Sequence, residues 1–254
     1  MSTQNALLTI LVEKINNDTL VLPTLPAIAL KVRKSADDPN INLNGMADVV
    51  GQDPSLSARM IKISNSAYLG RSIKVTSTTQ AVTRIGLNQV KNIATALAME
   101  QLFVSKNEVV KKYMAKMWTD TIDIVANAMA AMLTYKAATG KKNLSLDTIT
   151  LSALVANIGA LPVLTEAERH DSVFANPTFL DVAIEKLSGR IGGSIMREWQ
   201  FNDVFIQCAE HWRNLEFNEP TVGYIDFVRI GAALSNQAEN GDEILTLAQQ
   251  KGIF

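Results

Sequence analysis

Apolar side chains recur at every third or fourth position along most of this chain. The clearest case is residues 50–70, VGQDPSLSARMIKISNSAYLG, where the apolar positions are Leu56, Met60, Ile63 and Ala67. This spacing predicts an amphipathic helix with one buried face. Asp53 is well placed to cap its first turn, and Pro54 suits the first helical position. Asn65 and Ser66 are short polar residues that compete with the backbone and favour the end of this helix.

The same periodicity predicts helices over the rest of the chain and an all-α fold. They are expected at residues 6–15, 26–36, 43–51, 77–85, 88–103, 107–136, 147–158, 177–187, 191–199, 203–212, 222–235 and 242–250. Gly86 separates two of them, and residues 165–176 are polar and expected to be irregular. No stretch alternates β-branched and polar residues as strands do. We expect two tightly packed helical lobes, residues 1–105 and 106–254, which meet at the polar segment 103–107.

Composition narrows the class of protein further. With 47% hydrophobic and 19% charged residues, a chain of 254 residues can bury a sizeable core. Net charge is −1, which gives no long-range attraction to nucleic acid or to an anionic membrane. The single cysteine, Cys208, excludes an intramolecular disulfide and fits a reducing compartment. No signal peptide and no uninterrupted apolar run of about 18 residues is present. We therefore expect a soluble, cytoplasmic protein with no membrane or nucleic-acid partner.

Three blocks of sequence follow one another along the chain: LPTLP, the stretch 50–70 and TQAVTRIGLNQVKNIA. Together they resemble the HDOD (HD-related output domain) family, a bacterial signalling family related to the HD metal phosphohydrolases. The signature residues within these blocks are Asp53, Pro54, Asn65, Ser66 and Gly86. The resemblance is strongest over the N-terminal lobe. It implies an HD-like helical bundle, with one continuous HDOD unit over roughly residues 18–215 and additional terminal helices.

The resemblance also locates the positions at which an HD phosphohydrolase binds its metal, through an early His, a His-Asp doublet and a late Asp. The segment LVANIGALPV resembles the doublet segment, and Ala156-Asn157 stand where the doublet would be. The early His falls near Asp120 and the late Asp near Ala232. Alanine offers no ligand atom, and a neutral amide is a weak substitute for a carboxylate. We expect a degenerate metal site with no catalytic residue, no metal and no cofactor.

Histidine and cysteine offer little other metal-binding chemistry. The dipeptide His170-Asp171 lies in a polar connector, where two solvated loop residues are expected. Cys208 and His211 share one helix face, which fits half of a zinc site, but no second pair of ligands accompanies them. A buried thiol beside a hydrogen-bonded histidine is the preferred interpretation.

Two other patterns have structural explanations. Asp120 and Asp123 share a helical face, and a solvated face is expected there rather than a catalytic dyad. Gly192-Gly193 lacks the preceding strand and the lysine of a phosphate-binding loop, so close helix packing explains it.

These observations favour a non-catalytic regulatory domain of bacterial signal transduction that acts by binding a protein partner. A length of 254 residues leaves no room for an attached receiver or cyclase domain, so the signal is expected to arrive by association. One alternative is a sensor of a small ligand such as a nucleotide, in a metal-free ancestral pocket formed by Asp120, Ala156, Asn157 and His211. The other alternative is a residual metal-dependent phosphohydrolase.

Overall fold

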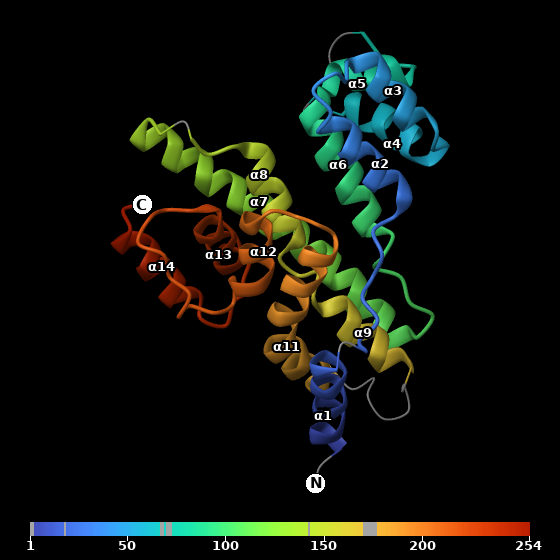
Figure 1. Cartoon of the computed structure of the whole chain (residues 1–254). Coiled ribbons are helices and arrows are strands. Elements are labelled where there is room, and N and C mark those ends of the chain that lie inside the picture. Colours follow the sequence, from blue (N-terminus) through green and yellow to red (C-terminus); the bar gives the residue numbers. More distant parts are fainter. Residues whose placement is uncertain (1–2, 18, 67–68, 70–72, 142, 170–176) are drawn as a thin grey trace. The chain divides into compact units, whose positions relative to one another are not determined.

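The structure, a computed structural model, describes residues 3–17, 19–66, 69, 73–141, 143–169 and 177–254. Over these ranges every regular element is a helix and no strand occurs, so the fold is all-α as the periodicity predicts (Figure 1). The chain forms two compact units. The smaller unit is Thr24–Gln101, and the larger unit combines Met1–Pro23 with Leu102–Phe254.

The first helix of the chain belongs to the larger unit, which differs from the expected division at residue 105. Helix α1 (Thr3–Asn16) packs against α11 (Pro177–Glu198). Its Lys14 pairs with the buried Glu166, and Leu11 is fully buried. After α1, the indole N–H of Trp199 donates to the Pro23 carbonyl at 2.9 Å. These contacts join residues far apart in the sequence, which helical periodicity does not reveal.

The smaller unit contains five helices among the described residues. They are α2 (Ala27–Ala36), α3 (Leu43–Gly51), α4 (Pro54–Ser64), α5 (Thr78–Ile85) and α6 (Leu87–Glu100). Helix α2 packs on α6, and α3 and α4 both pack on α5. The core between them contains Val32, Met46, Val50, Met60, Val82 and Val90, each with no exposed surface.

Helix α4 is formed as its sequence predicts. The Asp53 carboxylate accepts a hydrogen bond from the Leu56 N–H at 2.9 Å, and Pro54 is the first helical residue. Met60 is fully buried, but Ile63 is only half-buried. Ala67, the last predicted apolar position, lies outside the described residues.

Two signature residues of the smaller unit fix its turns. The Asn65 side chain donates to the Val75 carbonyl at 2.8 Å and accepts from the Val75 N–H at 2.9 Å, which ties the connector after α4 back onto the helix end. Gly86 has φ +88°, a conformation that disfavours other residues, and it separates α5 from α6.

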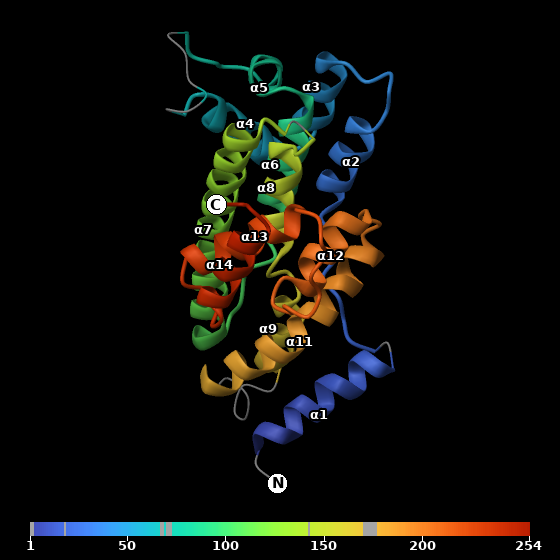
Figure 2. The ribbon, with the colours of Figure 1, turned by 90° about the vertical axis from the view of Figure 1, so that its left-hand side faces the viewer.

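The larger unit is built around the long helix α7 (Glu108–Thr139). The other helices that follow it are α8 (Leu146–Val155), α9 (Ala160–Arg169), α11, α12 (Asp203–His211), α13 (Tyr224–Leu234) and α14 (Gly241–Gln250). Helix α7 packs against both α8 and α13, and α11 packs against α9 and α12 (Figure 2). Ile124, Met132, Ile149, Phe227 and Ile230 have no exposed surface in this core.

Two predicted boundaries in the larger unit are wrong. Residues 165–169 continue α9 instead of forming irregular chain, since Ala167 is fully buried and Glu166 forms ion pairs with Lys14 and Arg169. The two helices expected over 177–199 form the single helix α11. The glycines in its middle are spacers for packing and do not interrupt it.

Close backbone approaches leave no room for a Cβ at Gly189 and Gly159 of this unit. A Cβ at Gly189 would lie 2.4 Å from the Glu210 carbonyl oxygen, where α11 meets α12. A Cβ at Gly159 would lie 1.8 Å from the carbonyl oxygen of Ser188. Close packing is also found at Gly192, where a Cβ would lie 3.0 Å from the Ala209 carbonyl oxygen of α12, whereas a Cβ at Gly193 would meet the side chain of Glu210.

The segment Leu146–Arg169 is the one stretch of the described chain that is long and apolar enough to cross a membrane, with a mean hydropathy of 1.6. Within the protein, 83% of the apolar 18-residue window in this stretch is buried. Its apolarity is therefore explained by its position in the core, where α8 and α9 pack against α7.

Candidate functional site

Two of the predicted pocket residues lie on one cleft of the larger unit, which has a volume of about 770 Å³. Asp120 reaches it from α7, and Asn157 reaches it from the turn that joins α8 to α9. Ala156 and His211 are not among the lining residues. The Ala156 carbonyl instead accepts a hydrogen bond from the Trp212 indole N–H at 2.9 Å, below the cleft surface.

The cleft is also lined by Arg213, an arginine that the sequence analysis did not single out. Arg213 Nη2 donates to Asn157 Oδ1 at 2.9 Å, and its Nη1 donates to Ser188 Oγ at 3.4 Å. The guanidinium carbon lies 3.9 Å from the centre of the Trp212 ring, which adds a cation–π contact. On its other side, Asn157 donates through Nδ2 to Thr121 Oγ1 at 3.2 Å. The amide at the doublet position is thus hydrogen-bonded on both ends.

Burial lowers the pKa of Arg213 to about 10, and the nearby charge of Glu185 acts in the opposite direction. The guanidinium therefore remains a cation at neutral pH. This positive charge lies beside Asn157 and is held in place by two neutral hydrogen-bond partners and the face of the Trp212 ring.

Charged residues surround this centre on several elements. The cleft is lined by Lys112, Tyr113, Lys116, Met117, Asp120, Asn157, Asp181, Ile184, Glu185, Trp212, Arg213, Gln237, Ala238, Glu239 and Asn240. Lys116 pairs with Asp120 at 2.6 Å, and the Tyr113 hydroxyl donates to Asp181 at 3.1 Å. Burial, together with this hydrogen bond, raises the pKa of Tyr113 to about 12. Both acids are therefore already engaged by a neighbouring side chain.

The donor atoms of this site do not fit a divalent metal. Ala156 and the fully buried Ala232 present no ligand atom, Asp120 is paired with Lys116, and the Asn157 oxygen accepts from a cation. Within the described ranges, no three His, Cys, Asp or Glu side chains are grouped as metal ligands would be. The side chains at this position are therefore unsuited to hold a divalent ion.

The other candidate ligands lie apart from the cleft. Cys208 is 1% exposed in α12, and burial raises the pKa of its thiol to about 12. The His211 ring stacks on Phe217 with the ring centres 4.3 Å apart. Asp123 is exposed on α7, and His170-Asp171 lie outside the described residues.

A second buried arginine holds the loop that carries Arg213. Arg229 of α13 is 3% exposed and donates to the carbonyl oxygens of Trp212 at 3.1 Å, Asn214 at 2.6 Å and Phe217 at 2.7 Å. Burial lowers its pKa, and the charge of Asp226 opposes that effect. An arginine inside a mostly apolar helix is the sequence signal that identifies such a residue.

Comparison with known proteins identifies the family. The HDOD domain profile matches residues 22–215. A protein of Shewanella amazonensis SB2B, provisionally named a metal-dependent phosphohydrolase, is 39% identical; its crystal structure aligns with a TM-score of 0.87 over 98% of this chain and 89% of its own.

More distant relatives share the fold. An HDOD domain protein of unknown function from Geobacter sulfurreducens is 16% identical, with a TM-score of 0.66 over 96% of this chain and 88% of its own. A protein of Marinobacter aquaeolei VT8, provisionally named a signal transduction protein, is 19% identical, with a TM-score of 0.65 over 99% of this chain and 66% of its own. A curated, uncharacterized protein of Treponema pallidum is 21% identical over 224 residues, which are 82% of this chain and 42% of that protein. Because the family profile covers most of its length, the chain belongs to the HDOD domain family.

Proposed function

We propose that this HDOD protein is a non-catalytic, cytoplasmic regulatory domain of bacterial signal transduction that acts by binding a protein partner. The observation that carries the proposal is the hydrogen bond from Arg213 to Asn157 at the position of the metal-binding doublet. A metal ion activates water by lowering its pKa and by acting as a Lewis acid. A guanidinium donates hydrogen bonds but is not a Lewis acid that activates a bound water, so the pair Arg213–Asn157 is suited to binding rather than to hydrolysis.

Signalling is the proposed context because of the family to which the chain belongs. The Marinobacter aquaeolei relative, provisionally named a signal transduction protein, supports the same direction. The name of the Shewanella amazonensis relative suggests the rival function, metal-dependent phosphohydrolysis. In a metal-dependent phosphohydrolase Asp120 would bind the metal, whereas in the regulatory function it remains the ion-pair partner of Lys116.

Hydrolysis of bis(p-nitrophenyl) phosphate separates these functions. The full chain is assayed with Mg²⁺, Mn²⁺, Fe²⁺, Ni²⁺ and Zn²⁺ in turn, alongside an Asp120→Asn variant purified in parallel. We expect the two proteins to release p-nitrophenol at the same background rate. A rate that is higher for the parent chain and lost in Asp120→Asn would overturn the non-catalytic proposal.

Partner binding is tested by cross-linking the tagged chain in cells of its source organism and identifying the captured proteins. A captured protein counts as a partner when, purified, it binds the purified chain with a measurable Kd. We expect at least one such protein. If every captured protein fails to rebind, partner binding is not the function.

A second candidate function, sensing of a small ligand, is favoured by the cleft itself. Its volume of about 770 Å³ lies in the range of small-molecule sites. The cleft contains a few polar groups of fixed geometry, among them Asn157 and Arg213. A ligand bound there would link helices α7 and α11, both of which line it.

A further inference from the structure

We propose that the cleft binds a small molecule through a compact oxyanion, a carboxylate or a phosphate, with Arg213 as the residue that anchors it. This inference rests on the second proposed function, ligand sensing, and goes further by naming the chemical class of the ligand. It depends on the hydrogen bonds of Arg213, on the cations and acids that line the cleft, and on its size.

Arg213 is held in a fixed position while much of its hydrogen-bonding capacity remains unused. A guanidinium has five N–H donors in a planar fork. Among the described residues, its two hydrogen bonds go to neutral oxygens, those of Asn157 and Ser188. The face of the guanidinium rests on Trp212, which leaves its edge for an in-plane partner. Carboxylates and phosphates match that edge because they accept two parallel N–H bonds.

A second cation lines the same cleft. Lys112 lies one helical turn before Lys116 on α7, and both belong to the lining. Lys116 is committed to Asp120 at 2.6 Å. Lys112 is exposed and sits where it can add a second positive charge to the site. An anionic group in the cleft could therefore interact with two cations, the fixed Arg213 and the exposed Lys112.

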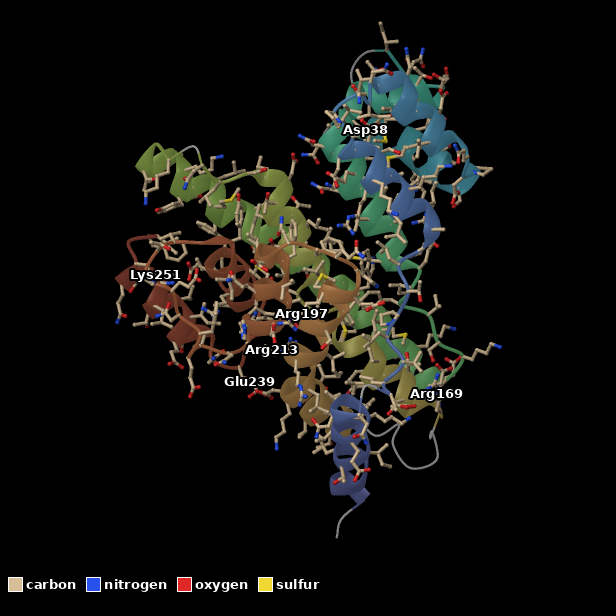
Figure 3. All side chains as sticks on the ribbon, in the orientation of Figure 1. Asp38, Arg169, Arg197, Arg213, Glu239 and Lys251 are labelled. Carbon is tan, nitrogen blue, oxygen red and sulfur yellow. The ribbon has the colours of Figure 1, made fainter. Side chains whose placement is uncertain are left out.

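The acids that line the cleft provide acceptors for other groups of the ligand, and the charge of Glu185 acts on Arg213 itself. Asp181 accepts from Tyr113, so its charge is partly satisfied within the protein. Glu185 and Glu239 are exposed members of the lining, and Figure 3 labels Glu239 together with Arg213. These carboxylates favour hydroxyl, amine or amide donors on the ligand. The matching molecules carry one oxyanion and several donors, as amino acids and nucleoside monophosphates do.

Isothermal titration calorimetry of the full chain tests the inference with four probes. Glutamate and succinate carry the carboxylate, AMP carries the phosphate, and adenosine is the uncharged match for AMP. We expect glutamate or AMP to bind with a Kd of about 1 mM or tighter. Binding of AMP without glutamate identifies phosphate as the anion, and the reverse identifies carboxylate. Adenosine is expected to bind at least ten-fold more weakly than AMP, by about 1.4 kcal/mol.

Three variants assign that binding to the cleft. Arg213→Gln removes the charge and is expected to raise the Kd of the bound probe by about 10-fold or more. Lys112→Gln changes an exposed residue and is expected to raise the Kd about 3-fold. The matched control is Arg197→Gln, on α11, where the arginine pairs with Glu210 and does not line the cleft. The control is expected to leave the Kd unchanged.

Each outcome decides the inference. If no anionic probe binds, or if binding is the same in the parent chain, Arg213→Gln and Lys112→Gln, the inference is wrong. If Arg213→Gln fails to fold by circular dichroism, Lys112→Gln decides. If adenosine binds as tightly as AMP and both are insensitive to the variants, the oxyanion inference fails while ligand sensing stands.

Discussion

Substitution of Gly159 by alanine should be among the most damaging single changes in the larger unit. A Cβ at this position would lie 1.8 Å from the Ser188 carbonyl oxygen and 2.5 Å from the Gly192 backbone nitrogen. Both neighbours are backbone atoms of α11, so no side-chain rotation relieves the overlap. Restoring a separation of 3.0 Å requires the turn after α8 and helix α11 to move apart by at least 1.2 Å, the difference between 3.0 and 1.8 Å.

The cost follows from what that movement would open. The residues beside the contact are buried, such as Ala160 after Gly159 and Ile191 before Gly192, so separation creates voids there. Overpacking of a core costs typically 1–3 kcal/mol, and displacement of the backbone places Gly159→Ala at about 4 kcal/mol or above. This is a large part of a typical total of about 5–15 kcal/mol.

Urea unfolding followed by circular dichroism measures the loss. Gly241→Ala is the matched control, because its Cβ would meet ordinary contacts at 3.6 Å in the first turn of α14. We expect the control to be as stable as the parent chain or up to about 1 kcal/mol more stable. A loss of less than about 1 kcal/mol for Gly159→Ala would refute the close approach of α11 to this turn.

Three further predictions concern other parts of the chain. Met60→Asp should destabilise the smaller unit by about 4 kcal/mol or more in thermal unfolding, because Met60 is fully buried. Ile63→Asp, at a half-buried position, should cost about half as much or less, and equal losses of stability would contradict the difference in burial. The Cys208 thiol, buried and with its pKa raised to about 12, should resist a thiol-reactive disulfide reagent at neutral pH until urea unfolds the chain; rapid reaction of the native protein would contradict its burial. Burial alone would raise the pKa of Glu166, but hydrogen bonds from Lys14 and Arg169 outweigh it and lower the pKa. Its contribution to stability is therefore present above its ordinary pKa of 4.5 and lost as the pH falls through the folded-state pKa. Between about pH 6 and 3, the free energy of unfolding in urea should fall less for Glu166→Gln than for the parent chain. Equal falls in the two proteins would refute the role of these ion pairs.

Local signals in the sequence were sufficient to predict most helices of this fold. Asp53 and Pro54 start α4 as expected, and Gly86 ends α5 as expected. The errors occur where tertiary contacts override local signals. The glycines of α11 predict a break in an isolated helix, but here they admit the backbone of α12. Residues 165–169 are polar in sequence, and they stay helical because Glu166 finds its cationic partners inside the unit.

The candidate site was predictable only in part. Asp120 and Asn157 were identified by resemblance, and both line the cleft. Arg213 was missed because it is 56 positions from its partner Asn157, and no local motif links the two. The sequence analysis includes His211 in the pocket, yet its ring stacks on Phe217 and His211 is not among the residues that line the cleft. Helix periodicity gives the face of a residue on its own helix, not the residue that it meets.

The proposal that the Arg213–Asn157 hydrogen bond lies where an HD phosphohydrolase would bind its metal makes a prediction about engineered metal binding. In Ala156→His with Asn157→Asp, the new carboxylate would face Arg213, whose Nη2 now donates to Asn157 at 2.9 Å. We expect this double variant to bind metal poorly because the guanidinium competes for the carboxylate. Adding Arg213→Ser removes the competitor, so the triple variant should bind Mn²⁺ or Ni²⁺ more tightly than the double variant.

The most direct measurement is the metal content of the purified full chain, by inductively coupled plasma mass spectrometry, after incubation with Mn²⁺, Fe²⁺, Ni²⁺ or Zn²⁺ and removal of the unbound ion. The account predicts far less than one equivalent of each ion per chain, with no change on Asp120→Ala, because Asp120 is paired with Lys116 and the Asn157 oxygen with Arg213. One equivalent of any of these ions in the parent chain, lost on Asp120→Ala, would contradict it.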